Sequence, residues 1–242
     1  MNYPISEKLI RNNRSHKPLK PEGIVVHSTA TPGATDEAEQ LYFDTGYRGA
    51  SAHYFADWDS ITRCIPENER AWHAGPTANA KFLSIEMCEP KGYDPAKFAQ
   101  VWDRTVWFVA DCCLRYGWGV DRILSHDHVS KKWRESTHTD PIGFLLKYGR
   151  TWAGFVGAVS RMIATLRIKR SMQTPTQKVV KKLGTIFKDL DDNDYSAEAF
   201  KTLKTLGIFR GDTQGNVRPD EPIKRKDLAI VIHNLLKLEK LV

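Results

Sequence analysis

The stretch Gly23-Ile24-Val25-Val26-His27 predicts the centre of the fold. It is a short apolar run followed by a Ser-Thr-Ala-Thr-Pro-Gly loop, a pattern typical of a buried strand that ends on a histidine. Phe82–Cys88 is a second apolar run, interrupted by a single carboxylate, Glu86. Because functional side chains are often carried where a rigid scaffold passes into its loops, we expect both residues to lie in a site.

The remaining sequence alternates strand and helix patterns. Residues 51–57 and 61–65 predict a hairpin, and 123–126 predict a further short strand. Apolar residues at helical spacing predict a long amphipathic helix over 94–116. Shorter helices are expected over 36–45 and 151–166. This mixture predicts an α/β domain whose mixed central sheet is flanked by helices.

The length of 242 residues allows one ordinary domain and a smaller one. We expect a catalytic domain over 1–165, a basic linker over 166–185 and a small α-helical domain over 186–242. The net charge of +7 arises largely in the linker, which holds six Lys or Arg residues and no acid. A basic segment of this kind either binds anionic polymers or serves as a solvated tether.

Composition excludes several classes of protein. No apolar run reaches the roughly 20 residues of a membrane span, and no nucleic-acid-binding motif accompanies the basic segment. The first residues lack the apolar core of a secretory signal, so we expect a cytoplasmic location in the producing cell. The four cysteines show no metal-binding spacing, and we interpret them as reduced core residues.

Histidines supply the strongest chemical signal. His27 follows its strand, and the stretch from Ser125-His126-Asp127-His128 to Thr137-His138-Thr139-Asp140-Pro141 adds further donors. Two imidazoles and one carboxylate, here His27, His126 and Asp140, are a typical ligand set for catalytic zinc, which keeps a position open for water. His128 and His138 remain alternatives as ligands, and each histidine has a purely structural interpretation as well.

Other residues are candidates for the reaction itself. Burial would raise the pKa of Glu86 and suit it to accept a proton, unless its side chain faces solvent. His138 is placed to stabilise a developing oxyanion. His53, Trp72 and His73 are expected to line a substrate groove, against the alternative of ordinary structural residues.

Five motifs in register carry a resemblance to a known family. They are Gly23–Thr29, Ser51-Ala52-His53-Tyr54, Ala71-Trp72-His73-Ala74-Gly75, Ser84-Ile85-Glu86 and His126 with Thr139-Asp140-Pro141. In this order and spacing, roughly residues 5–160 resemble the type-2 N-acetylmuramoyl-L-alanine amidases, a family that includes phage lysins and is similar to peptidoglycan recognition proteins.

The resemblance implies zinc held by His27, His126 and Asp140, with Glu86 as general base. The implied reaction is hydrolysis of the amide between N-acetylmuramic acid and L-alanine in peptidoglycan. One departure is His138, which stands where many relatives carry lysine two positions before the last ligand. If oxyanion stabilisation requires a protonated His138, activity should fall above neutral pH.

Residues 186–238 resemble a single S-layer homology module. The matching pieces are Phe187–Leu190, Ala199–Ile208, Gly211–Pro219 and Ile223–Asp227. The resemblance implies attachment to an anionic secondary cell-wall polymer, with Arg225 as the contact residue. Such modules commonly pack as three repeats, so association of chains through this module is a further expectation. The alternative is a small helical domain that only packs.

Together these features predict a peptidoglycan hydrolase, specifically a phage endolysin that acts on the wall of a Gram-positive host after holin-type release. The alternative is a non-catalytic peptidoglycan-binding protein on the same scaffold. Such proteins typically lose a zinc ligand, whereas this sequence retains all three candidates and Glu86.

Overall fold

The structure is a computed structural model that describes residues 3–173, 189, 197–209, 211–218, 220–222 and 224–238. The chain divides into two compact units, residues 1–167 and 168–242.

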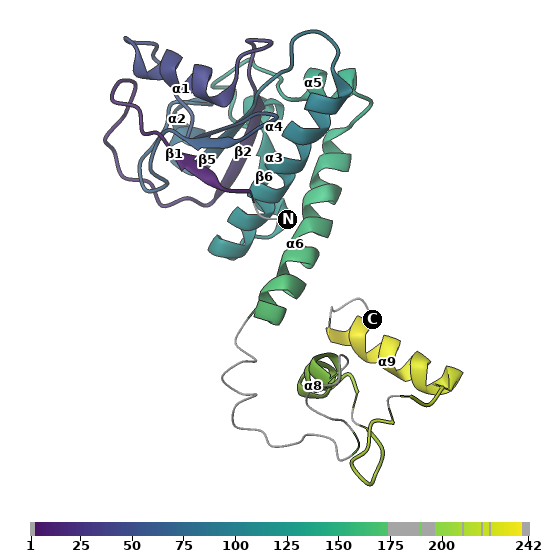
Figure 1. Ribbon diagram of the computed structural model, residues 1–242. Coiled ribbons are helices and arrows are strands. Elements are labelled where there is room, and N and C mark those ends of the chain that lie inside the picture. Colours follow the sequence, from purple (N-terminus) through teal and green to yellow (C-terminus); the bar gives the residue numbers. More distant parts are fainter. Residues whose placement is uncertain are drawn as a thin grey trace. The chain divides into compact units, whose positions relative to one another are not determined.

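The first unit is built on a six-stranded sheet with the order β1-β4-β3-β5-β2-β6 (Figure 1). The pair β3 and β4 is antiparallel, and every other neighbouring pair is parallel, which confirms the expected mixed sheet. The strands are β1 (Ile5–Glu7), β2 (Gly23–Ser28), β3 (Tyr54–Ala56), β4 (Ile61–Arg63), β5 (Phe82–Met87) and β6 (Ile123–Ser125).

Side-chain caps mark the start of two helices, and a glycine marks the end of one of them. Thr35 accepts a hydrogen bond from the Ala38 amide at the start of the first helix, and Asp94 accepts one from the Lys97 amide at the start of the longest. Gly117 ends that long helix in the left-handed conformation, with φ of 71°. The helices are α1 (Asp36–Asp44), α2 (Pro76–Asn79), α3 (Pro95–Tyr116), α4 (His126–Trp133), α5 (Ile142–Lys147) and α6 (Trp152–Gln173).

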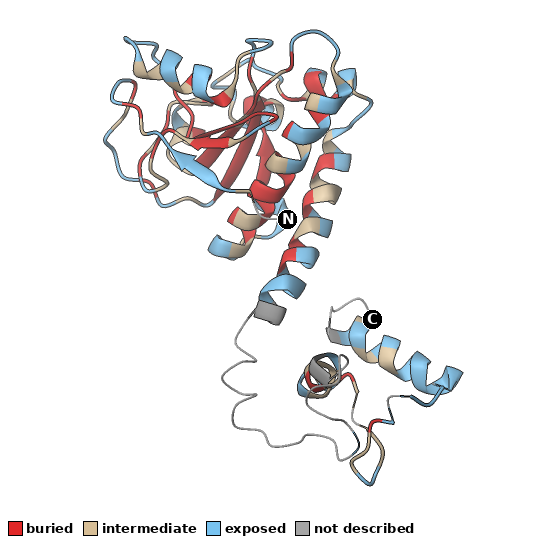
Figure 2. Cartoon of the chain, in the orientation of Figure 1, coloured by how far each residue is buried: buried red, intermediate tan, exposed pale blue. Residues whose placement is uncertain are grey.

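The sheet separates two layers of core, because side chains alternate between its faces along each strand. Ile24 and Val26 of β2 pack in a large cluster with residues of α3 and α6. Val25 packs on the opposite face with residues of α2 and α4. Both central strands are buried, and the helices expose their outer sides (Figure 2). By the same alternation, His27 projects from the face opposite α3.

The register of the central strands brings two predicted site residues together. β2 and β5 are parallel neighbours, and His27 lies directly opposite Glu86. Both residues stand one position before the end of their strand. Parallel strands carry their carboxyl ends at one edge of a sheet, and this edge is where sites form in α/β folds.

Two local expectations are corrected. The strand expected over 123–126 ends at Ser125, whose hydroxyl accepts a hydrogen bond from the His128 amide and caps α4. His126 and His128 are therefore helical neighbours, and His128 is exposed, so His128 does not join His126 as a ligand. The helix expected over 151–166 continues to Gln173 and includes the start of the expected linker.

The second unit contains α8 (Ala197–Thr205) and α9 (Arg225–Leu238), joined by a loop, as the sequence predicts. Gly207 follows α8 with φ of 71°. The Asp189 carboxylate accepts hydrogen bonds from the amides of Val217 and Arg218, which fixes the loop. Residues 174–185 of the expected linker lie outside the described residues.

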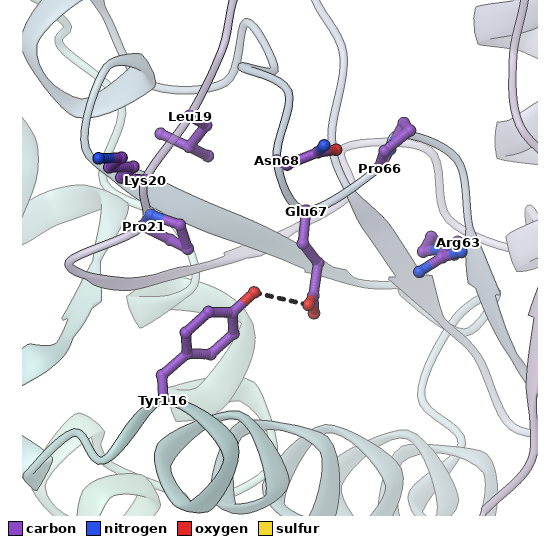
Figure 3. A pocket seen from close by; sticks show the side chains of 8 residues that line it. All are labelled: Leu19, Lys20, Pro21, Arg63, Pro66, Glu67, Asn68 and Tyr116. Atoms are coloured by element: carbon purple, nitrogen blue, oxygen red, sulfur yellow. Dashed lines mark hydrogen bonds between the residues drawn. The ribbon is translucent and has the colours of Figure 1, made fainter.

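A pocket of about 640 Å³ opens on the first unit, at the end of β4 (Figure 3). Glu67 lies inside it and accepts a hydrogen bond from Tyr116 and a bidentate ion pair from Arg115. Because β4 runs antiparallel to β3, this pocket is at the opposite end of β3 from the edge that carries Glu86. The lining residues are Leu19, Lys20, Pro21, Arg63, Pro66, Glu67, Asn68 and Tyr116.

Among the described helices, none has the length and apolar character needed to cross a membrane.

Candidate metal centre

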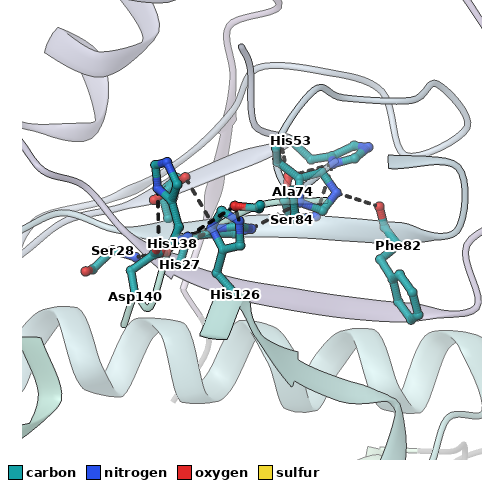
Figure 4. A network of polar contacts seen from close by, with 12 residues as sticks. His27, Ser28, His53, Ala74, Phe82, Ser84, His126, His138 and Asp140 are labelled. Carbon is teal, nitrogen blue, oxygen red and sulfur yellow. Dashed lines mark hydrogen bonds and ion pairs between the residues drawn. The ribbon is translucent and has the colours of Figure 1, made fainter. Parts of the chain in front are cut away.

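Three predicted ligands meet at the carboxyl edge of the sheet (Figure 4). The Nδ1 atoms of His27 and His126 are 3.0 Å apart. Asp140 places Oδ2 3.1 Å from Nδ1 of His27 and Oδ1 3.1 Å from Nδ1 of His126. The carboxylate of Asp140 thus places one oxygen beside each imidazole, and one donor atom from each of the three residues lies within 4.8 Å of the others.

Three different elements deliver these donors. His27 is near the end of β2, and His126 is the first residue of α4, directly after β6. Asp140 comes from the loop after α4, which is tied back by a hydrogen bond from the Asp127 amide to the Asp140 carbonyl. The pairing of β2 with β6 brings the first two residues together although 99 positions separate them.

The donor set fits a zinc ion. Ligand atoms bound to tetrahedral zinc at about 2.0–2.2 Å lie roughly 3.3 Å apart, close to the separations observed here. Burial lowers the pKa of His27, against the opposing effect of Asp140, so its imidazole is kept neutral as a ligand must be. Burial opposes ionisation of Asp140, but the adjacent imidazoles of His126 and His27 outweigh it and lower the pKa of Asp140.

Glu86 lies beside these donors, with Oε1 4.0 Å from Nδ1 of His27. Its side chain is 18% exposed, and its Oε2 atom has no hydrogen-bond partner within the described part of the chain. Burial, reinforced by the negative charges of Asp140, Glu39 and Glu89, raises the pKa of Glu86 well above its usual value. A carboxyl group in this environment accepts a proton readily, as general-base chemistry requires.

His138 lies over the outer side of the centre. Its ring stacks on that of His126, with centroids 5.0 Å apart and planes at 15°. Nδ1 of His138 is 3.8 Å from Oδ1 of Asp140, and the side chain is 71% exposed. His138 is therefore at the solvent side of the centre, where a substrate would approach, and the tighter cluster of donors is formed without it.

His73 contacts one of the three candidate metal ligands. Its Nδ1 is 3.1 Å from Nε2 of His27, and its Nε2 is 3.3 Å from the carbonyl oxygen of Phe82. Both ring nitrogens are thus engaged inside the protein. His73 therefore contacts the candidate ligand His27, and its role in binding substrate stays a prediction.

The expectation that His53 contacts substrate is wrong. His53 is completely buried, with Nδ1 paired to Ser84 and Nε2 donating to the carbonyl of Glu69. Burial lowers its pKa to about 4. With no accessible surface and both nitrogens hydrogen-bonded, His53 is a structural residue that connects β5 to the segment before Trp72.

Trp72 is half-buried, and its ring contacts Tyr47 edge to face at a centroid distance of 6.4 Å. Its role in binding substrate stays a prediction. Arg225 is exposed at the first position of α9, and its contact with a wall polymer likewise stays a prediction.

Sequence reasoning missed Ser136. The Ser136 hydroxyl lies 2.9 Å from Nε2 of His126 and accepts a hydrogen bond from the His138 amide at 3.2 Å. A serine in a polar loop gives no periodic or motif signal. Only its position four residues before Asp140, in the loop that closes the site, could have drawn attention to it.

Comparison with known proteins gives the same assignment. The family model for N-acetylmuramoyl-L-alanine amidase matches residues 17–143, and the S-layer homology domain model matches residues 186–229. Both resemblances noted in the sequence are thereby confirmed.

Individual proteins match as well. N-acetylmuramoyl-L-alanine amidase CwlL of Bacillus licheniformis is 38% identical over 127 residues, which cover 46% of this chain and 35% of CwlL. The crystal structure of the Staphylococcus aureus hydrolase AmiA in complex with its ligand matches with a TM-score of 0.63 and 25% identity, covering 70% of this chain and 88% of that one. A mutant endolysin from Bacillus subtilis matches with a TM-score of 0.56 and 27% identity, covering 65% and 99%.

The chain spans about a third or less of the length of the curated relatives that it matches. The match to the amidase model nevertheless covers more than half of this chain and includes all three converging donors. The chain belongs to the N-acetylmuramoyl-L-alanine amidase family.

Proposed function

We propose that this protein is a zinc-dependent amidase that hydrolyses the bond between N-acetylmuramic acid and L-alanine in peptidoglycan. The observation that carries the proposal is the convergence of His27, His126 and Asp140 beside the buried carboxyl group of Glu86. Membership of the amidase family and the similarity to CwlL support the choice of substrate.

The chemistry follows from the positions of the side chains. A bound zinc ion would polarise the amide carbonyl and increase the acidity of the attacking water. Glu86 accepts a proton from that water while the water oxygen adds to the carbonyl carbon. The proton then passes to the departing nitrogen of L-alanine as the C–N bond breaks. His138, on the open side of the centre, donates a hydrogen bond to the carbonyl oxygen as negative charge develops there.

Mass analysis of the products from purified Gram-positive peptidoglycan tests the reaction. We expect free stem peptides that begin with L-alanine, their release abolished by a chelator and restored by zinc. The variant H27A should release none. Intact glycopeptide with protein still bound would instead identify a non-catalytic peptidoglycan-binding protein, and the roles given to Glu86 and His138 would be abandoned.

The role of His138 has its own test in the dependence of activity on pH. A histidine donates from a charged ring only at low pH, whereas the lysine found in many relatives keeps its charge through pH 9. We expect the wild-type rate to fall between pH 6 and 9 and the variant H138K to sustain activity at the upper end. A flat wild-type profile would contradict a charged His138.

The S-layer homology domain supports a second part of the proposal, attachment to an anionic cell-wall polymer through Arg225. Co-sedimentation with purified walls should weaken in R225A and remain unchanged in the matched variant K226A, which removes the adjacent exposed cation. Sedimentation velocity on the full chain tests association through this module. A monomer at all concentrations would count against that association.

The biological setting that we propose is a phage endolysin, held in the cytoplasm until released. The similarity to an endolysin from Bacillus subtilis supports this setting. Expression in a Gram-positive host should lyse the cells only when a holin is co-expressed. Lysis or export without a holin would favour a host enzyme.

A further inference from the structure

We infer that Ser136 and His73 are positioning residues that orient the two histidine ligands and fix which ring nitrogen faces the metal. The inference rests on the proposed zinc centre. It assigns one outer hydrogen-bond partner to each of the two imidazoles, His73 to His27 and Ser136 to His126.

The proton positions follow from the geometry. The Nδ1 atoms of His27 and His126 point toward each other and toward Asp140, so each must present a lone pair to bind a metal. A neutral imidazole then carries its proton on Nε2. That nitrogen must donate a hydrogen bond, and the partner beside it must accept.

An acceptor stands at each Nε2 atom. His27 donates to Nδ1 of His73 at 3.1 Å, and His73 in turn donates from its own Nε2 to the Phe82 carbonyl at 3.3 Å. The chain of donors therefore runs in one direction, from the ligand to the backbone of β5.

The second ligand is held from the opposite side. His126 donates from Nε2 to the Ser136 hydroxyl at 2.9 Å, and the same oxygen accepts from the His138 amide. Ser136 therefore joins the ring of one ligand to the backbone of the loop that supplies His138 and Asp140. Its loss would free the His126 ring and loosen that loop at the same time.

Both partners are uncharged, whereas many zinc sites place a carboxylate behind the histidine. A carboxylate partner makes the imidazole more basic and a stronger ligand. A neutral acceptor orients the ring while leaving more positive charge on the metal. Neutral partners therefore favour polarisation of the substrate carbonyl by the metal, at the expense of tighter metal binding.

The test measures zinc affinity directly, by competition with a chromophoric chelator, on the full chain. Loss of an outer partner typically costs 10- to 100-fold in metal affinity. We expect losses of this order for S136A and H73L. The variants S136T and H73N keep an oxygen acceptor near the same place and should stay within about threefold of the wild type.

Ser130 supplies the matched control. It lies on α4 like His126, but its buried hydroxyl has no hydrogen-bond partner within the described ranges. S130A should therefore bind zinc with wild-type affinity. The absorption spectrum of the cobalt-substituted protein gives a second readout, and its bands should shift in S136A and not in S130A.

Thermal unfolding of the metal-free variants separates a loss of positioning from a loss of folding. Ser136 is a half-buried residue in an otherwise exposed loop, so S136A should unfold at the wild-type temperature even if H73L is destabilised. Wild-type zinc affinity and an unchanged cobalt spectrum in S136A would overturn the inference. Failure of the wild type itself to bind zinc would instead overturn the proposed function, and the inference with it.

Discussion

Glu86 is half-buried close to Asp140, and its buried Oε2 atom is unpaired among the residues that the structure describes. A buried carboxyl group without a partner costs folding free energy, and such costs persist where function requires them. Glu86 lies opposite the candidate ligand His27 of β2, so the pairing of β2 with β5 fixes the position of Glu86.

The variant E86Q should therefore be nearly inactive and more stable. We expect the rate of hydrolysis to fall by about 10²- to 10⁴-fold, because a general base is lost. In the presence of a chelator, the free energy of unfolding at pH 7 should rise by about 1 kcal/mol, because an ionisable group leaves the interior. Urea unfolding measures this change. A variant that loses both activity and stability would show that Glu86 is structural.

His53 provides a prediction about stability and pH. Burial holds its pKa at about 4, below the usual 6.5 of histidine. In the unfolded chain His53 takes up a proton as the pH falls below about 6.5, whereas in the folded protein it stays neutral until about pH 4. The contribution of His53 to the free energy of unfolding is therefore fully present above pH 6.5. It decreases by about 3 kcal/mol as the pH falls from 6.5 to 4.

Urea unfolding of wild type and H53Q from pH 7.5 to 4.5 checks this contribution. The free energy of unfolding of the wild type should fall more steeply with decreasing pH than that of H53Q. The difference in slope should correspond to at most one additional proton taken up on unfolding. H53Q should be less stable at pH 7.5, because the hydrogen bonds to Ser84 and Glu69 are altered. Parallel profiles for the two proteins would contradict the assignment.

At the scale of elements, α3 supports the sheet beneath the metal centre. It spans Pro95–Tyr116 and buries Phe98, Val101 and Val109 among others in the main core. Gly117 ends the helix with φ of 71°, a conformation that other residues adopt at a cost. The space beside its Cα is open, because a methyl group at this position would have no described atom within 4 Å.

Substitution of Gly117 should therefore report backbone strain alone. G117A should lower the free energy of unfolding by about 1 kcal/mol. The matched variant G143A, within α5 and equally open, lacks a positive φ and should raise it by about 0.5–1 kcal/mol. Chemical denaturation of both variants measures the two changes, and equal effects of the same sign would contradict this account of the helix end.

In the molecule as a whole, the candidate metal centre and the S-layer homology domain belong to different compact units. The first unit has its own large core and contains the three candidate metal ligands His27, His126 and Asp140. Folding and chemistry should therefore be independent of the second unit, whereas retention on the cell wall should depend on it.

A truncated protein of residues 1–173 tests this division. We expect cooperative unfolding within a few degrees of the full chain and unchanged hydrolysis of soluble muropeptides. Co-sedimentation with intact walls should be strongly reduced. Undiminished wall binding would place the targeting function in the first unit, and loss of cooperative unfolding would show that the units depend on each other.

Local sequence patterns were sufficient to predict several parts of this protein. Apolar runs located β2 and β5, and helical spacing and caps located α1 and α3. The amidase-like motifs singled out His27, His126 and Asp140, which the fold brings together as candidate metal ligands. These features succeed because strand burial, helix capping and motif spacing are properties of short segments.

The surroundings of His53, His73 and His128, in contrast, depend on the tertiary structure. Strand register and the turn into α4 bury His53, place His73 behind His27 and leave His128 exposed. The loop closure that brings Ser136 against His126 involves no pattern of its own. The hydrogen-bond partners of a side chain depend on how distant segments pack. Local sequence therefore does not distinguish a histidine that binds metal from one that orients a ligand or one that faces water.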